Sequence, residues 1–131
     1  MKIITFLSDF GNKDWFVSAV KGEIFKINKN VLIVDITHTL IPHDVRSAAF
    51  LLKSVYRNFP SGTVHLVVVD PGVGSERIPI IVESSGYYFV GPDNGVFSYI
   101  YSEDSKVYEI EVKKTVSYTF HARDIFGPTA G

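Results

Sequence analysis

The sequence predicts an α/β fold: a layered sheet with a parallel β-α-β-α-β core, helices packed on that sheet, and an antiparallel extension after residue 76. The core is indicated by short apolar runs that alternate with longer segments whose apolar residues recur at helical spacing. The extension is indicated by short strand-like segments with only turn signals between them. We expect residues 1–131 to form a single domain, because no linker, repeat or low-complexity segment divides them.

The core elements follow one another within the first part of the chain. Residues 2–8 (KIITFLS) are predicted to form a short buried strand, and residues 14–28 a helix. Residues 31–36 (VLIVDI) predict a second strand, and residues 44–59 a second helix. Residues 63–70 (TVHLVVVD) predict the third strand, whose mostly apolar composition is typical of a strand buried on both faces of a parallel sheet.

Each helix is predicted to turn one apolar face toward the sheet. Asp14 is predicted to begin the first helix, and Pro60 stops the second. The predicted faces consist of Phe16, Val20, Ile24 and Ile27 in the first helix and of Val45, Ala48, Leu52, Val55 and Phe59 in the second.

The segments IPIIVES, GYYFVG and KVYEIEV predict the short strands of the extension. SSG and GPDNG separate them, and GPDNG carries the strongest turn signal in the chain, so local patterns alone favour a hairpin turn at residues 91–96. A further helix is predicted to begin at Asp124.

The composition narrows the classes of function. The formal net charge is −1 and no basic run exceeds Lys113-Lys114, which speaks against nucleic acid as a partner. The chain has no cysteine, so disulfides and thiolate chemistry are excluded. Neither a signal-peptide pattern nor an apolar run of membrane-spanning length is present, so we expect a cytoplasmic protein without a membrane partner.

Carboxylates stand near the carboxyl ends of all three core strands. The first strand leads into Asp9, the second into Asp35 and the third into Asp70. A single such Asp is more often a turn or cap residue. Because open α/β sheets bind ligands outside the carboxyl ends of their strands, three together indicate a site at this edge.

Several other motifs carry weaker signals. The glycines of DPGVG do not form a phosphate loop, because no Lys-Ser/Thr pair and no helix pattern follow. His65 lies within an apolar strand, which favours a core imidazole bonded to a neighbour over a ligand. His38 and His43 have no common metal-ligand spacing, so we expect no metal site.

The segment FHARD gathers His121, Arg123 and Asp124 directly before the last predicted helix. An N-cap by Asp124 is the simpler interpretation. It leaves His121 without a structural role.

Six segments, in this order, match a family that we recognise: SDFGNKD, KGEIF, DITHTLIPHDVRSAA, GTVHLVVVDPGVG, GPDNG and FHARDIF. The chain resembles the S-adenosyl-L-methionine (SAM) hydroxide adenosyltransferases, adenosine-forming SAM hydrolases related to fluorinase and chlorinase. The resemblance covers essentially the whole sequence. It implies that water, acting as hydroxide, attacks the ribose C5′ of SAM and expels methionine, giving adenosine.

The resemblance also implies roles for particular residues. The catalytic triad falls on Asp70, Arg77 and His121, the ribose-holding carboxylate on Asp9, and the carboxylate facing the methionine amino group on Asp14. SAM is then the substrate, adenosine a product, and no cofactor is required.

The chain departs from the family pattern in two ways. Ala122 stands where a glycine is usual, which adds a methyl group near the water pocket. The family continues into a β-rich C-terminal domain that supplies adenine contacts, and it forms homotrimers with sites between subunits. We therefore interpret residues 1–131 as the N-terminal catalytic domain of such a protein, and we expect this domain alone to hydrolyse SAM slowly or not at all.

Two rival functions stay open at this point. A SAM-dependent halogenase is disfavoured, because the Asp70 carboxylate would repel an anionic halide. A non-catalytic SAM- or adenosine-binding domain is the alternative from a different class.

Overall fold

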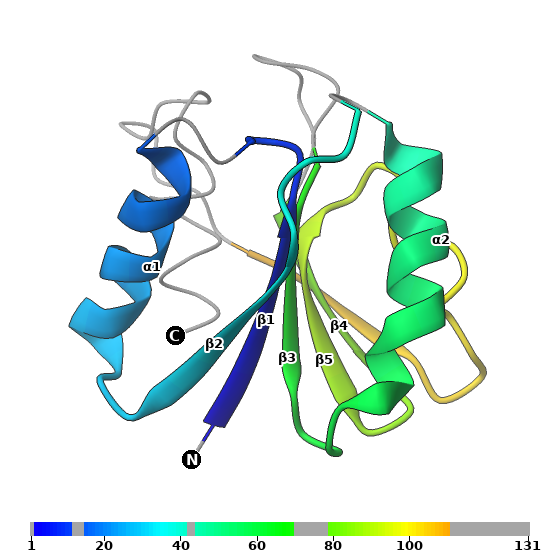
Figure 1. Cartoon of the computed structure of the whole chain (residues 1–131). Helices are drawn as coiled ribbons and strands as arrows, with labels where there is room; N and C mark the ends of the chain where they lie inside the picture. The colour runs from blue at the N-terminus through cyan, green and yellow to red at the C-terminus, as the bar shows by residue number, and fades with distance from the viewer. Residues whose placement is uncertain (1, 12–14, 42–43, 70–78, 111–131) are drawn as a thin grey trace.

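The computed structural model describes residues 2–11, 15–41, 44–69 and 79–110, and their order confirms the predicted α/β fold (Figure 1). The elements are β1 (Lys2–Ser8), α1 (Phe16–Ile27), β2 (Val31–Thr37), α2 (Val45–Val55) with a short 3-10 turn (Tyr56–Asn58), β3 (Val64–Val68), β4 (Pro79–Ser84), β5 (Tyr87–Pro92) and β6 (Lys106–Glu109).

The strands form one six-stranded sheet in the order β2-β1-β3-β5-β4-β6. β2, β1, β3 and β5 are parallel neighbours, whereas β4 runs antiparallel to both β5 and β6. The parallel core and the antiparallel extension are therefore both present. β5 adds a fourth parallel strand that the sequence patterns did not predict, because it pairs with β3 as well as with its hairpin partner β4.

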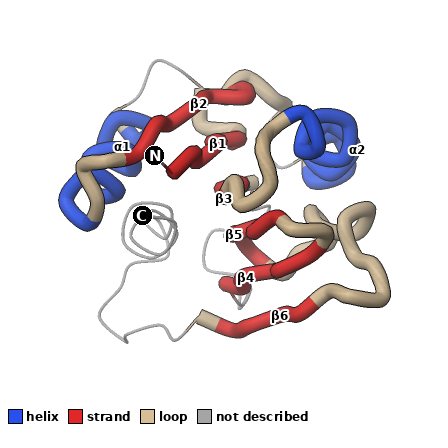
Figure 2. Tube along the Cα trace, turned by 90° about the horizontal axis from the view of Figure 1, so that it is seen from below, coloured by secondary structure: helices blue, strands red, loops and turns tan. Residues whose placement is uncertain are grey.

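The two helices cover opposite faces of the sheet (Figures 1 and 2). Val20 and Ile24 of α1 pack against one face, and Ala48 and Leu52 of α2 pack in the core on the other. The central strand β3 is thereby buried on both faces, and its five residues are all buried. Ile27, which was predicted to face the core, is instead 61% exposed at the last position of α1.

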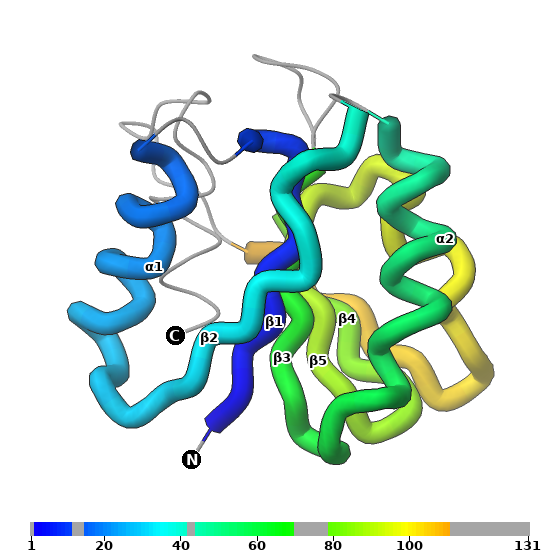
Figure 3. Tube along the Cα trace, viewed as in Figure 1, coloured from blue at the N-terminus to red at the C-terminus, as the bar shows by residue number. Residues whose placement is uncertain are grey.

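The chain passes from β1 through α1 to β2 and then returns across β1 to reach β3 by way of α2 (Figure 3). Along the chain β1 is followed by β2 and β3 by β4, and these two strands lie in opposite directions from the β1–β3 pair in the sheet. In doubly wound sheets this is the point at which ligands bind, outside the carboxyl ends of the two strands. The topology places the ends of β1 and β3 at that point.

Two predicted turns have different outcomes. Ser85 and Gly86 join β4 to β5, and their positive φ values of 55° and 84° suit a type I′ hairpin. The prediction of a hairpin at residues 91–96 is wrong. Gly91 and Pro92 belong to β5, and the chain then leaves the sheet through a series of turns before β6 pairs with β4.

His65 is a core residue, as predicted. Its Nδ1 lies 2.6 Å from the hydroxyl of Thr5 on the neighbouring strand, and the aromatic rings of Tyr56, Tyr87 and Phe89 surround it. Burial lowers the pKa of His65 to about 4, with a weaker opposing effect from the backbone of Tyr56. The imidazole is therefore neutral at pH 7.

Candidate functional site

The carboxyl ends of β1 and β3 lie side by side. Ser8, the last residue of β1, pairs with Val68, the last residue of β3. Asp9 follows Ser8 directly, and the buried Val69 follows Val68 and precedes Asp70. The half-buried Asp9 is thus the predicted site residue that the described structure brings to this edge.

The segment that carries Asp9 turns sharply away from the sheet. Gly11 has a φ of +78°, a conformation that side chains other than glycine rarely adopt. Its backbone N–H donates to the carbonyl of His38, 2.6 Å away, just beyond the end of β2. The N–H of Phe10 also points to the Ser8 hydroxyl, at 3.4 Å. These contacts fix the course of the chain on both sides of Asp9.

The His38 side chain connects β1 to β2 at this edge. Its Nδ1 lies 2.5 Å from the Ser8 hydroxyl, and its Nε2 lies 2.8 Å from Oδ1 of Asp35. Ser8 and His38 are both buried, and the ring of Phe6 packs edge-on against the imidazole. The Ser8–His38 contact was not predicted, since it joins residues that lie 30 positions apart in the sequence.

Asp35 does not serve as a free carboxylate at the edge, which corrects the expectation of three carboxylates there. β2 continues to Thr37, so Asp35 lies inside the strand, where Lys21 of α1 contacts its Oδ2 at 2.6 Å. Partial burial raises the pKa of Asp35, but hydrogen bonds from His38 and Lys21 outweigh this effect and lower it overall. Asp35 is therefore ionised and already paired.

The ionised Asp35 determines how the hydrogen atoms are arranged around His38. A carboxylate only accepts hydrogen bonds, so Nε2 of His38 must carry a hydrogen and donate it to Asp35. In the neutral ring, Nδ1 then accepts from the Ser8 hydroxyl, which leaves the hydroxyl oxygen to accept from the Phe10 N–H. Every polar group in the chain of contacts has a partner in this arrangement.

The GPDNG segment, which contains the end of β5 and the residues after it, supports the end of β3. The Asn94 amide donates to the carbonyl of Val69 over 2.6 Å, and its carbonyl accepts from the N–H of Val96 at 3.1 Å. Gly91 lies so close to β3 that an added Cβ would come within 2.5 Å of the Val67 carbonyl oxygen. The GPDNG segment, interpreted from sequence as a turn, is thus in contact with the residue that precedes Asp70.

The remaining predicted site residues fall outside the described part of the chain. They are Asp14, Asp70, Arg77 and His121, together with the neighbouring Ala122 and the predicted cap Asp124. Their assigned roles stay predictions. His43 also lies outside the described residues.

Residues 2–11, 15–41, 44–69 and 79–110 contain no cluster of three or more potential metal ligands. His38 could be a metal ligand by residue type, but both of its ring nitrogens already contact Ser8 and Asp35.

Within the described residues no helix is long and apolar enough to cross a membrane.

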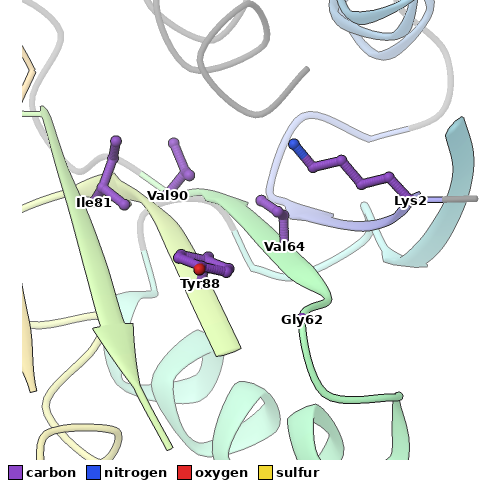
Figure 4. Close-up of a pocket in the computed structure, with 6 residues that line it drawn as sticks. All are labelled: Lys2, Gly62, Val64, Ile81, Tyr88 and Val90. Carbon is purple, nitrogen blue, oxygen red and sulfur yellow. The ribbon is translucent and has the colours of Figure 1, made fainter. Parts of the chain in front are cut away.

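An open cavity of about 340 Å³ lies elsewhere, on the face of the sheet that α1 partly covers (Figure 4). Its lining consists of Lys2, Gly62, Val64, Ile81, Tyr88 and Val90. Lys2 and Val64 begin β1 and β3, so this cavity lies toward the ends of those strands that are opposite Asp9. It offers few polar groups to a ligand.

Comparisons with known proteins agree with the resemblance seen in the sequence. A family model described as the SAM hydroxide adenosyltransferase N-terminal domain matches residues 4–131. An (R)-S-adenosyl-L-methionine hydrolase of Methanocaldococcus jannaschii is 40% identical over 96% of this chain and 51% of its own length. A protein of the same name from Thermus thermophilus is 35% identical over 99% of this chain and 56% of its own length.

More distant and structural relatives extend the comparison. A fluorinase of an Actinoplanes species is 26% identical over 86% of this chain and 46% of its own length. The crystal structure of an uncharacterized conserved protein from Thermotoga maritima superimposes with a TM-score of 0.88 and 42% identity, covering 97% of this chain and 51% of that one. The chain thus spans about half the length of the relatives it matches.

Proposed function

The chain belongs to the SAM hydroxide adenosyltransferase family, and on this basis we propose that it provides the catalytic domain for hydrolysis of SAM to adenosine and methionine. The observation that carries the proposal is 35–40% identity, over nearly the whole chain, to proteins named SAM hydrolases. The geometry supports it, because the Asp9 segment is fixed beside the end of β3 at the switch point of the sheet.

The chemistry defines what the site must supply. Hydroxide attack on the carbon next to a sulfonium annihilates charge and releases a neutral thioether, so the leaving group needs no general acid. Water has a pKa of about 15.7 and an ordinary Asp one of about 3.9, so a carboxylate alone is a weak base toward it. Cationic or hydrogen-bond-donating groups beside the water are therefore needed to stabilise the developing hydroxide.

The predicted residues fit these requirements. Arg77 and His121 would stabilise the hydroxide, and Asp70 would orient the water and accept or relay its proton. Asp9 would accept the ribose hydroxyls, and Asp14 would face the methionine ammonium group. No resident cofactor is needed, since the sulfonium of SAM is itself the activated leaving group.

The proposal extends to the setting in which the protein works. Residues 1–131 would form a single catalytic domain that acts in a homotrimer in the cytoplasm. Its partners would be SAM and adenosine rather than nucleic acid or membrane, in keeping with a net charge of −1. These points rest on the family resemblance.

Halogenation is the second candidate, because fluorinases are among the relatives. The related fluorinases are 26–28% identical to this chain, below the 35–40% of the hydrolases. A carboxylate at Asp70 would also repel a halide approaching C5′.

The test is incubation of the protein, as encoded by its complete gene, with SAM in buffers with and without fluoride or chloride, followed by chromatography. We expect adenosine and methionine in equal amounts, independent of halide. A halogenated nucleoside would support the halogenase, and adenosine binding without turnover would support a non-catalytic binding domain. Either outcome contradicts the hydrolase proposal.

A further inference from the structure

We propose that His38 is a positioning residue that holds the Ser8–Gly11 segment in place and thereby sets the location of Asp9. The inference rests on the proposed function, in which Asp9 accepts the ribose hydroxyls. It assigns a role to a residue that touches neither the reacting atoms nor, in this account, the substrate.

His38 contacts the Ser8–Gly11 segment at two points, one on each side of Asp9. Its imidazole Nδ1 contacts the hydroxyl of Ser8, immediately before Asp9, at 2.5 Å. Its backbone carbonyl accepts from the N–H of Gly11, two residues after Asp9, at 2.6 Å. Because His38 contacts both ends of the Ser8–Gly11 segment, a shift of His38 would also shift Asp9.

The two His38 contacts lie just beyond the end of the β1–β2 ladder. The β1–β2 ladder becomes irregular between Phe6 and Leu7, and its last pair joins Leu7 to Thr37. Beyond that pair the chain turns at Gly11, so the β1–β2 ladder does not extend to Asp9. The two bonds from His38 act in the place of the missing ladder.

The ring of His38 is itself held in place by Asp35, which contacts the nitrogen opposite Ser8. Asp35 binds Nε2 at 2.8 Å, and Lys21 holds Asp35 at 2.6 Å, so the contacts run from α1 through β2 to the end of β1. Phe6 packs against the ring and His38 is only 4% exposed, which leaves few alternative rotamers. Outer partners of this kind commonly determine the orientation of the residue that binds a ligand.

The chain contains a matched control on the same strand. Thr5 and His65 form a second buried hydroxyl–imidazole pair, at 2.6 Å, which joins β1 to β3 within the paired region. Removing either imidazole leaves a buried hydroxyl without its partner and destabilises the fold. Only His38 adjoins the Asp9 segment.

The experiment compares His38→Ala, His38→Asn and His65→Ala in the protein encoded by the complete gene, measuring adenosine affinity by calorimetry together with kcat and KM for SAM. His38→Ala should weaken adenosine binding and raise KM about tenfold or more, as expected when a charge-assisted hydrogen bond loses its geometry, with a smaller effect on kcat. His38→Asn can still place a polar atom near Ser8, and should recover part of the affinity. His65→Ala should lower Tm and leave adenosine affinity unchanged.

The outcomes separate this inference from the proposed function. Unchanged adenosine affinity in His38→Ala, or an equal loss in His65→Ala, would overturn the positioning role even if the wild type hydrolyses SAM. A wild type that binds adenosine but does not convert SAM would overturn the hydrolase proposal alone. Should His38→Ala fail to fold, Lys21→Met tests the same contacts from their exposed end, and a KM equal to that of the wild type would count against the inference.

Discussion

Asp9 and Asp35 are both carboxylates near the end of a parallel strand, but their surroundings give them different chemistry. Asp35 has a cation and an imidazole within hydrogen-bond distance, so its charge is already balanced. Asp9 lies beyond its strand, on a segment that neighbouring residues fix by backbone and hydroxyl contacts. Asp9 lies at the carboxyl end of β1, where sheets of this kind bind their ligands, and this is the position that its proposed ribose role requires.

Asp9→Asn should weaken the binding of SAM and of adenosine alike. A carboxylate that accepts two ribose hydroxyls makes charge-assisted hydrogen bonds, each worth roughly 1.5 to 3 kcal/mol, and the amide loses part of this. Calorimetry with adenosine measures the effect without turnover. Equal affinity in mutant and wild type would remove Asp9 from the ribose site.

Asp70→Ala and His121→Ala should each reduce hydrolysis by about 10²-fold or more, the scale of losing a positioned proton acceptor or a charge-stabilising donor. The measurement is adenosine formation at saturating SAM, with circular dichroism as a check on folding. Glu103→Ala, a change at an exposed residue in a turn outside the site, serves as the control. Wild-type rates in both folded mutants would reject the assignment.

At the scale of the elements, the core could be predicted because its signals are local. Residues 2–8 were predicted and observed as a strand without any change of boundary, since a short apolar run bounded by polar residues suffices. β5 could not be placed from its own sequence. Its pairing with β3 depends on contacts between distant segments, and the turn signal at GPDNG suggested a hairpin that is absent.

Residues of the candidate site could be predicted only where their place follows from the end of a strand. Asp9 follows from the rule that sheet edges bind ligands, and it lies at such an edge. The Ser8–His38 contact spans 30 positions in sequence, and the Asn94–Val69 contact spans 25, so neither has a local signal. Asp35 was misinterpreted because its strand continues one residue beyond the predicted end at residue 36 and because Lys21 pairs with its carboxylate, a contact between distant segments.

A substitution at Gly91 tests how closely β5 packs against β3, and the same substitution at Gly22 in α1 provides a comparison. Gly91→Ala would place a Cβ 2.5 Å from the Val67 carbonyl oxygen and 3.0 Å from the Phe97 ring, so we expect a loss of about 1–3 kcal/mol in the free energy of unfolding. Gly22→Ala has nothing within 4 Å of the added carbon and lies inside α1, so it should instead stabilise by roughly 0.5–1 kcal/mol.

Denaturant unfolding measures both variants, and they should change the midpoint in opposite directions. Because β3 leads directly to Asp70, Gly91→Ala should also slow hydrolysis, whereas Gly22→Ala should not. A Gly91→Ala protein as stable and as active as the wild type would contradict the close packing of the two strands.

At the scale of the whole molecule, His65 makes stability depend on pH. Its pKa is about 4 in the fold and 6.5 when exposed, so between these values the unfolded chain binds a proton that the folded chain does not. The free energy of unfolding should therefore be fully retained above pH 6.5 and fall by up to roughly 3 kcal/mol as the pH drops toward 4.

The Thr5→Val/His65→Phe double variant provides the comparison, because it removes both partners and leaves no buried hydroxyl unpaired. Urea unfolding at a series of pH values between 4 and 7 should show a steeper loss for the wild type than for the double variant. Parallel curves would mean that His65 does not titrate with the fold.

In the proposed reaction this domain places a water molecule so that its oxygen attacks the ribose C5′ of SAM. The direct measurement is turnover of SAM in water enriched in the heavy oxygen isotope, followed by mass spectrometry of both products. We predict one heavy oxygen atom in the 5′-hydroxyl of adenosine and none in methionine. Adenosine without the label, or a labelled methionine product, would contradict attack of water at C5′ and with it the function proposed for this site.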